Sequence, residues 1–360
     1  MLARGISVAH RPRCGTPRNL DCLHRDDSAP ARWTWSQSDP GHARRDRGAG
    51  LAQRGASLSR IGLAGRSFGC EYFVLWLVPV GGLSRGESTL FEGKTVLVTG
   101  AATIIGAEVA GVFAEYSANV VLGDIDTDGG KEAAAAIGDR AVFVPLDVRS
   151  DASIRSFVAA AVERHGRIDV LVNIACVYGD DGPGGDARAQ WLDVLNTNVV
   201  GAAMLCEQAR PQLRDTAGSI VNFASPSGRI AQAGRIRYPV SKAGMLQLTR
   251  SLALEYAGDG IRVNSVSPGW TWSRVMDEIT EGDRARTDAV ASRFHMLGRA
   301  ADAREIGEVV AFLTSSKASF VTGAEWTVDG GYSALGPEQT TSAIELLMRE
   351  RPESHATSLA

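Results

Sequence analysis

"KTVLVTGAATIIGAEVAGVFAEY" occupies residues 94–116 and decides the fold of this chain. Its opening run is apolar and β-branched, which predicts a buried strand that ends at Thr99-Gly100. The remainder carries apolar residues at helical spacing. Gly100 then lies at the tight exit from the strand, and Gly106 lies in the first turn of the helix, where backbone N–H groups and the helix dipole can receive a pyrophosphate. The stretch therefore predicts a dinucleotide-phosphate turn.

The alternation of strand and helix continues downstream. Apolar, strand-like runs at residues 118–124, 141–147 and 168–175 are separated by helix-like segments, one of them from Ala152 to His165. Such alternation indicates right-handed βαβ units and a parallel sheet that helices cover on both faces. We predict an α/β fold with a Rossmann-type doubly wound parallel sheet in a single domain.

Asp124 closes the second predicted strand, about 20 residues after the glycine turn. A carboxylate at this position can accept hydrogen bonds from an adenosine ribose diol and repels a 2'-phosphate. No Arg or Lys lies between Thr95 and Gly130 to offset that repulsion. The sequence favours NAD over NADP as the coenzyme.

Composition divides the chain into three parts. Residues 1–88 contain thirteen Arg, no Lys and no apolar repeat, and are expected to form a low-order Arg- and Gly-rich extension. They are interpreted as a disordered tail or as sequence ahead of the natural start of the functional domain. Their Arg-rich, acid-free beginning leaves an organellar transit peptide as an alternative. A folded catalytic domain is expected over 89–335, and a polar C-terminal tail over 336–360.

Charge and cysteine content narrow the classes of partner. The formal net charge is -3 and the pI is about 6.1, so nothing favours a nucleic-acid or membrane partner. The apolar run Phe73–Leu83 is broken by Pro79 and is too short for a membrane span. The domain has only Cys176 and Cys206, which fits a reduced cytoplasmic setting. The histidines and cysteines show no clustered spacing, so no metal site is expected.

From Gly93 to about Leu335 the chain resembles the short-chain dehydrogenase/reductase family in its shorter form. The motifs that carry the resemblance are, in order, Thr99-Gly100 with Gly106, Asp124, Asp147, Asn198 in "NTNVVG", Ser225, Tyr238 and Lys242 in "YPVSK", Pro268-Gly269, and "VDGGY" at Val328–Tyr332. The resemblance implies an NAD(P)-dependent enzyme that acts on CH–OH groups. It also implies coenzyme contacts from Thr99, Gly100, Thr103, Ile105, Gly106, Asp124, Asp147, Val148, Asn173, Tyr238, Lys242, Pro268, Gly269 and Thr271.

Tyr238 and Lys242 are four residues apart, so they share one side of a helix. A neighbouring ammonium and an oxidised nicotinamide both favour the phenolate, which brings a proton transfer at Tyr238 nearer to working pH. Ser225 can hydrogen-bond the substrate oxygen. By resemblance, Lys242 also holds the nicotinamide ribose, and Asn198 anchors a water that links Lys242 to solvent. The predicted reaction is reversible hydride transfer between a secondary alcohol and NAD⁺.

Two departures from the family pattern bear on coenzyme affinity. Ile104 stands where the family usually has its second glycine, so its side chain should shift the turn or rotate away from the coenzyme. "NIAC", Asn173–Cys176, replaces the usual NNAG after the fourth strand. Ile174 and Cys176 are expected to alter packing beside the adenosine ribose.

Aromatic and basic residues near the predicted site bear on the choice of substrate. Trp270, Trp272 and Met276 fall in the region that the family uses as a mobile lid; with Tyr178 and Phe294 they suit a hydrophobic or cyclic alcohol, or else they pack on the protein's own core. Arg229 and Arg235 either form surface ion pairs or meet an acidic substrate.

The resemblance also bears on alternative functions, on assembly and on the residue beside the nicotinamide. A reductase of 3-oxoacyl-carrier-type ketones and a non-catalytic NAD sensor stay as alternatives to an alcohol dehydrogenase. Two long helical segments, residues 189–213 and 238–257, are apolar on more than one face, which suggests a homotetramer or homodimer. Ser273 stands where the family commonly has a Thr beside the nicotinamide carboxamide.

Overall fold

The computed structural model describes residues 89–179, 187–336 and 342–349. Seven parallel strands form one sheet in the order β3-β2-β1-β4-β5-β6-β7. The strands are β1 Thr95–Thr99, β2 Asn119–Asp124, β3 Ala141–Pro145, β4 Val170–Asn173, β5 Ser219–Phe223, β6 Arg262–Pro268 and β7 Glu325–Val328. The predicted doubly wound Rossmann-type sheet is confirmed. The expected N-terminal extension lies outside the described residues.

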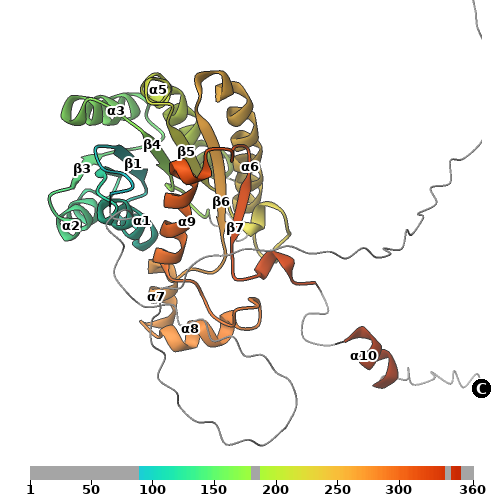
Figure 1. Ribbon diagram of the computed structural model, residues 1–360. Helices are drawn as coiled ribbons and strands as arrows, with labels where there is room; N and C mark the ends of the chain where they lie inside the picture. Colours follow the sequence, from blue (N-terminus) through green and yellow to red (C-terminus); the bar gives the residue numbers. More distant parts are fainter. Residues whose placement is uncertain (1–88, 180–186, 337–341, 350–360) are drawn as a thin grey trace, which may run out of the picture. The chain divides into compact units, whose positions relative to one another are not determined.

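The described α-helices are α1 Ile104–Glu115, α2 Thr127–Ile137, α3 Asp151–His165, α4 Ala187–Leu195, α5 Gly201–Asp215, α6 Arg237–Tyr256, α7 Arg274–Thr280, α8 Arg284–Ala291, α9 Ala303–Thr314 and α10 Ala343–Arg349. Helices α1 to α6 and α9 connect the strands and cover the sheet, whereas α10 follows the last strand (Figure 1). None of the helices in the described ranges combines the length and apolar character that a membrane span requires.

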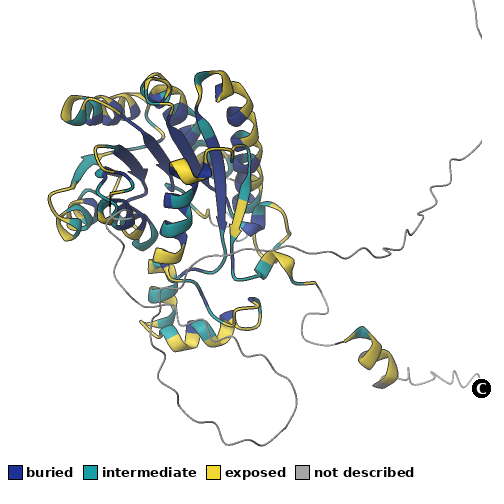
Figure 2. Cartoon of the chain, in the orientation of Figure 1, coloured by how far each residue is buried: buried dark blue, intermediate teal, exposed yellow. Residues whose placement is uncertain are grey.

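The central strands of the sheet are buried on both faces, and Figure 2 shows them dark, with the edge strands β3 and β7 and the outer faces of the helices more exposed. Side chains alternate along each strand, so β1 directs Val96 and Val98 to one layer and Leu97 to the other. The first layer is closed by α1 and α9, with Phe113 among its largest buried side chains. The second is closed by α3, α5 and α6, with Phe157 at its centre. This double burial explains why the strands read as continuous apolar runs.

One helical segment differs from the sequence expectation. The long helix expected over residues 189–213 is divided into α4 and α5 by a π-helical turn, Asn196–Val200. A π turn inside a helix widens its backbone locally and is frequent at functional sites. It carries Asn198, one of the predicted catalytic residues. The amphipathic pattern alone does not reveal it, because the period of apolar residues on either side remains helical.

The topology also shows where a ligand can bind. The strand order reverses between β1, which pairs with β2, and β4, which pairs with β5. In open α/β sheets the carboxyl ends of the strands leave a crevice at such a reversal. Figure 1 shows α7 and α8 lying beyond this edge of the sheet.

Candidate active site

The glycine turn after β1 leaves space that side chains would fill. Gly100 has φ +67°, and a Cβ there would lie 2.8 Å from the backbone nitrogen of Ala175. A Cβ on Gly106 would lie 2.2 Å from the carbonyl oxygen of Gly100. Thr103 caps α1, since its Oγ1 accepts from the Gly106 nitrogen at 3.0 Å and donates to the Gly100 oxygen at 2.8 Å. The first turn of α1 therefore begins directly against the strand exit, with its N–H groups facing the crevice edge.

Asp124 is joined to this turn. Its Oδ2 accepts a hydrogen bond from the Ala102 nitrogen at 3.0 Å, and its Oδ1 accepts from the Asp126 nitrogen at 2.9 Å. The carboxylate at the end of β2 is thereby held beside the glycine turn, as the sequence spacing predicts.

A cavity of about 430 Å³ runs along the carboxyl edge from the glycine turn toward Tyr178. Its predicted members are Gly100, Thr103, Ile105, Asp124, Asp147 and Val148. The other lining residues are Gly123, Ile125, Leu146, Arg149, Ile174, Ala175, Cys176, Val177, Tyr178, Thr197, Ser273, Arg274 and Val275. Ile104 does not line the cavity, so its side chain is no obstacle there. The apolar walls, the glycine cradle and the Asp124 carboxylate beside it fit a dinucleotide.

Tyr238 and Lys242 lie together at the start of α6, next to this cavity. Tyr238 is 8% exposed and Lys242 is 3% exposed, and the Lys242 Nζ lies 5.4 Å from the centre of the Tyr238 ring. The ammonium donates to the carbonyl oxygen of Phe223, at the end of β5, over 2.8 Å. That bond fixes the ammonium at the carboxyl edge of the sheet. The Tyr178 ring, which lines the cavity, is 4.9 Å from the Tyr238 ring.

Ser225 completes the group from the other side. It follows β5, and its side chain lies near the Tyr238 hydroxyl, where it lowers the pKa of the phenol. Its Oγ also accepts from the Ser227 Oγ at 2.9 Å and from the Ser227 nitrogen at 3.2 Å. Ser227 is a residue that the sequence reasoning missed. The structure thus brings Ser225, Tyr238 and Lys242 together, and adds a second hydroxyl that orients Ser225.

Burial sets the proton affinity of the phenol. Burial raises the pKa of Tyr238, the nearby Cys176 thiol acts in the same direction, and the hydrogen bond with Ser225 and the charge of Arg235 lower it. The net direction is upward. The cost of burying the phenolate is the largest of these effects. In the coenzyme-free protein the Tyr238 phenol therefore keeps its proton and can act as a proton donor.

The Asn198 carboxamide joins two segments of the site by hydrogen bonds. Its Oδ1 accepts from the Val177 nitrogen at 2.7 Å, and its Nδ2 donates to the Val177 oxygen at 2.8 Å and to the Ser241 Oγ at 3.0 Å. Ser241 in turn donates to the Tyr238 carbonyl oxygen at 2.7 Å. The carboxamide, 1% exposed, thus ties the segment after β4 to the first turn of α6. It holds Tyr238 and the cavity wall in register.

Several predicted coenzyme residues have side chains away from the cavity. The Asn173 Nδ2 donates to the Asn222 Oδ1 at 2.9 Å inside the sheet. The reason is that β4 lies between β1 and β5, and the two amides pair across the strands. The Thr99 Oγ1 accepts from the backbone nitrogens of Ile174 and Ala175. Thr99 thus shapes the cavity floor without lining it.

The first residues after β6 lie outside the lining of this cavity. Pro268, Gly269 and Thr271 do not line the cavity; Thr271 is buried and its Oγ1 donates to the Gly269 oxygen at 3.2 Å. Trp270 packs against Phe294, with ring centres 5.5 Å apart. The guanidinium of Arg284 covers Trp272. Both tryptophans thus have packing partners within the protein, and Trp270 also lines a second cavity.

Basic residues reach the cavity from distant parts of the chain. Arg149 pairs with Asp147 at 3.0 Å and with Asp193 at 3.3 Å, and the hydrogen bond from its side chain is the main cause of the lowered pKa of Asp147. Arg274, on α7, lies 4.0 Å from Asp126 and 3.2 Å from Glu278. Both were missed, because a window around the glycine turn contains neither. In the sequence, Arg149 could have been found only from its position directly after Val148, a predicted coenzyme residue just after β3.

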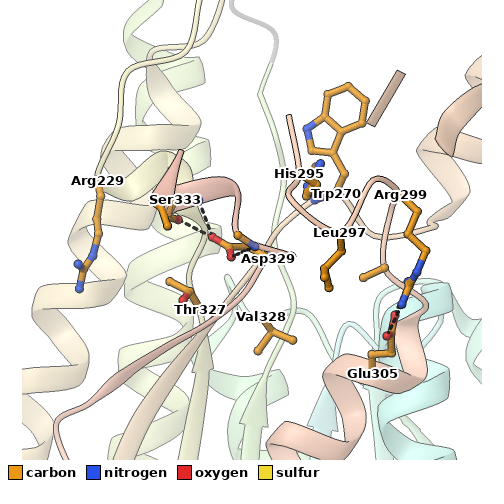
Figure 3. Close-up of a pocket in the computed structure, with 14 residues that line it drawn as sticks. Arg229, Trp270, His295, Leu297, Arg299, Glu305, Thr327, Val328, Asp329 and Ser333 are labelled. Atoms are coloured by element: carbon orange, nitrogen blue, oxygen red, sulfur yellow. Dashed lines mark hydrogen bonds and ion pairs between the residues drawn. The ribbon is translucent and has the colours of Figure 1, made fainter. Parts of the chain in front are cut away.

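A second cavity, of about 540 Å³, lies between β7, the start of α9 and Trp270 (Figure 3). It shares no lining residue with the first cavity. Its charged groups are paired internally: Arg299 with Glu305 at 2.7 Å, Arg229 with Glu325, and Asp329 with the hydroxyl of Ser333. In the described ranges, no group of three or more His, Cys, Asp or Glu is placed to hold a metal ion.

Residues 100–333 match the protein family described as Enoyl-(Acyl carrier protein) reductase. The chain is 38% identical to cis-4-hydroxycyclohexanecarboxylate dehydrogenase of Sinomonas cyclohexanicum, over 68% of this chain and 98% of the relative. The chain belongs to the short-chain dehydrogenase/reductase family. It is an oxidoreductase, and the predicted family membership is confirmed.

Two further relatives show the breadth of this family. Meso-2,3-butanediol dehydrogenase of Serratia marcescens is 35% identical over 68% of this chain and 96% of its own length. A solved short-chain dehydrogenase/reductase from Brucella melitensis, titled glucose/ribitol dehydrogenase, is 35% identical, with a TM-score of 0.62 over 68% of this chain and 98% of that one. Proteins of this family generally use an NAD(P) coenzyme. Their names differ in the alcohol, so the substrate must be argued from this chain's own residues.

Proposed function

We propose that this protein is an NAD-dependent oxidoreductase that interconverts a secondary alcohol and a ketone, with Tyr238 as the acid/base. The observation that carries the proposal is the buried Tyr238, which lies between Ser225 and the Lys242 ammonium beside a cavity that fits a dinucleotide. A phenol that is set as a donor in the free protein suits protonation of a carbonyl oxygen. Placing proton donor and substrate oxygen in advance removes much of the entropic barrier.

The chain's residues divide the work of binding and proton transfer. Gly100, Thr103 and Gly106 form the turn that would hold the pyrophosphate, and Asp124 would accept from the ribose diol. When bound, a nicotinamide coenzyme supplies the hydride acceptor for alcohol oxidation and the hydride donor for ketone reduction. Tyr238 takes or gives the hydroxyl proton. Lys242 provides positive charge beside the phenolic oxygen when that proton leaves.

Supporting residues keep this geometry. Ser225 hydrogen-bonds the substrate oxygen, and Ser227 holds Ser225 in place. Asn198 acts through Val177 and Ser241, so it is a positioning residue at this site rather than a group that touches substrate. A non-catalytic NAD sensor would have no use for this arrangement around a proton donor.

Mixing the full-length protein with NAD⁺ and a panel of secondary alcohols tests the function directly. The panel contains cyclic hydroxy acids, their methyl esters and vicinal diols, since relatives are named for acting on the first and last of these. We expect NADH to appear by absorbance with at least one cyclic alcohol. A 3-oxoacyl thioester with NADH serves as the competing substrate. Turnover of that thioester alone would replace the alcohol dehydrogenase assignment, and no turnover with unimpaired NAD binding would favour a sensor.

Coenzyme choice is tested at Asp124. Replacing Asp124 by Asn keeps a hydrogen-bond acceptor for the Ala102 nitrogen but removes the charge that repels a 2'-phosphate. We expect the ratio of kcat/KM for NADP⁺ to that for NAD⁺ to rise on the order of tenfold, as removal of one nearby like charge allows. Asp128→Asn, an exposed charge that does not line the cavity, is the matched control and should leave the ratio unchanged. An equal ratio in both variants would remove the argument for NAD.

We further propose a homotetramer or homodimer in the cytoplasm, formed by the 89–335 catalytic domain. Along α6, Val240 is 47% exposed and Leu254 is 82% exposed, although the opposite side of the helix is buried on the sheet. Such exposed apolar side chains are common at interfaces between subunits.

A further inference from the structure

Arg235 is presented to the reaction centre by a tight turn that leads into α6. The turn is closed by an antiparallel bridge between Gln232 and Arg235, with Gly234 at φ +74°. The Gln232 side chain donates to the Tyr332 hydroxyl at 3.1 Å, which ties the turn to the segment after β7. The position of Arg235 is therefore set by the fold and not by a free loop end.

The guanidinium of Arg235 lies over the two tyrosines of the site. Its Cζ is 5.6 Å from the centre of the Tyr178 ring and 5.9 Å from that of Tyr238. Among the residues that the structure describes, no carboxylate is paired with it. Arg229, six residues earlier, provides the contrast, because its Nε donates to Glu325 at 2.6 Å. The two arginines that the sequence left undecided thus have different roles: Arg229 forms an ion pair, and Arg235 keeps its charge beside the phenol.

An arginine held against aromatic rings retains N–H donors at its edge. The rings restrict the guanidinium without using its donors, so less entropy is lost when it binds a planar anion. A carboxylate matches the spacing of these donors and can accept two parallel hydrogen bonds. A small molecule whose hydroxyl oxygen lies at Tyr238 would carry such a group within reach of Arg235.

We propose that Arg235 binds the carboxylate of the substrate, so that the substrate class is a small secondary alcohol or ketone that carries an acid group. This inference rests on the proposed function. The charge of Arg235 also lowers the proton affinity of Tyr238, which would help the same site in alcohol oxidation. If Arg235 binds the acid group, its removal should affect acidic substrates more than neutral ones. If it only assists the phenol, its removal should affect both equally.

The experiment compares 4-hydroxycyclohexanecarboxylate with its methyl ester, which keeps the ring and the hydroxyl but removes the charge. With wild-type protein and NAD⁺, we expect a higher kcat/KM for the acid, and a KM for the acid that rises with ionic strength because Arg235 is exposed. Arg235→Gln should lower kcat/KM for the acid by at least about tenfold, the effect of losing hydrogen bonds to a charged group. It should lower kcat/KM for the ester much less, because the ester loses only the effect of Arg235 on Tyr238. Arg235→Lys should recover part of the loss. Arg229→Gln is the matched control and should change neither substrate.

Binding is measured separately from turnover, so that failure of the two proposals can be told apart. In a Tyr238→Phe background with bound coenzyme, calorimetry should show tighter binding of the acid than of the ester, and Arg235→Gln should remove the difference. Equal losses on acid and ester in Arg235→Gln would overturn the proposal, since Arg235 would then act on the phenol alone. A wild-type protein that binds and oxidises the two equally would also overturn it, while leaving the alcohol dehydrogenase assignment intact.

Discussion

Replacing Tyr238 by Phe should lower turnover by about a thousandfold or more, while the protein still folds and binds its coenzyme. The substitution removes only the hydroxyl, and the ring keeps its contacts with Tyr178 and Lys242. What is lost is a proton donor on a buried side chain that lies beside Ser225. General acid–base catalysis by a positioned side chain is worth on the order of a hundredfold to ten-thousandfold.

The measurement is NADH formation at saturating alcohol, with NAD affinity determined independently by fluorescence quenching. Tyr256→Phe is the matched control, because Tyr256 is buried in the same helix and its hydroxyl has no hydrogen-bond partner in the described part of the chain. That variant should keep full activity. If Tyr238→Phe retained substantial turnover, the proton would have to come from another group, and the assignment of roles around Tyr238 would fail.

The direction of proton transfer adds a constraint on how the site works. Burial raises the pKa of Tyr238, so the phenol holds its proton in the coenzyme-free protein. Donation to a developing alkoxide is then direct. Alcohol oxidation runs the other way and requires charge stabilisation at the phenolic oxygen. The ammonium of Lys242, fixed by the Phe223 carbonyl, and the guanidinium of Arg235 provide positive charge on two sides.

Local sequence patterns were sufficient to predict the fold and the positions of the candidate site residues that follow strands. The run before Gly100 is apolar because β1 is buried on both faces, and Asp124 lies beside the glycine turn because β1 and β2 are neighbours in register. Ser225, Tyr238 and Lys242 meet because β5 ends beneath the first turn of α6. These relations depend on short segments and on the handedness of βαβ units, which sequence periodicity captures.

Contacts between distant segments could not be predicted in the same way. Arg274 and Arg149 reach the cavity from α7 and from the end of β3, which are far in sequence from the glycine turn. The Asn173 amide pairs with Asn222 across the sheet, and the Asn198 carboxamide is fully used by Val177 and Ser241. A family pattern names such residues but does not say which hydrogen bonds they make, because those bonds depend on side-chain packing that periodicity does not encode.

Adding one methyl group at Gly106 should weaken coenzyme binding by roughly tenfold to a hundredfold. A Cβ at this position would lie 2.2 Å from the Gly100 oxygen and 2.8 Å from the Ala101 Cα, and both neighbours are backbone that cannot rotate away. Overpacking of this kind costs about 1–3 kcal/mol, and the strain is relieved most directly by moving the glycine turn away from α1. Each 1.4 kcal/mol is about tenfold in a dissociation constant.

Gly111→Ala is the control that isolates this effect. Gly111 belongs to the same helix, and a Cβ there would meet nothing within 4 Å. Because alanine is favoured over glycine inside a helix, Gly111→Ala should raise the free energy of unfolding by about 0.5–1 kcal/mol and leave NAD affinity unchanged. Gly106→Ala should lower the free energy of unfolding and weaken NAD binding. Chemical denaturation measures the first effect and NAD titration the second. Unimpaired NAD binding in Gly106→Ala would mean that the pyrophosphate does not lie on this turn, because the turn cannot keep its present shape once the methyl group is there.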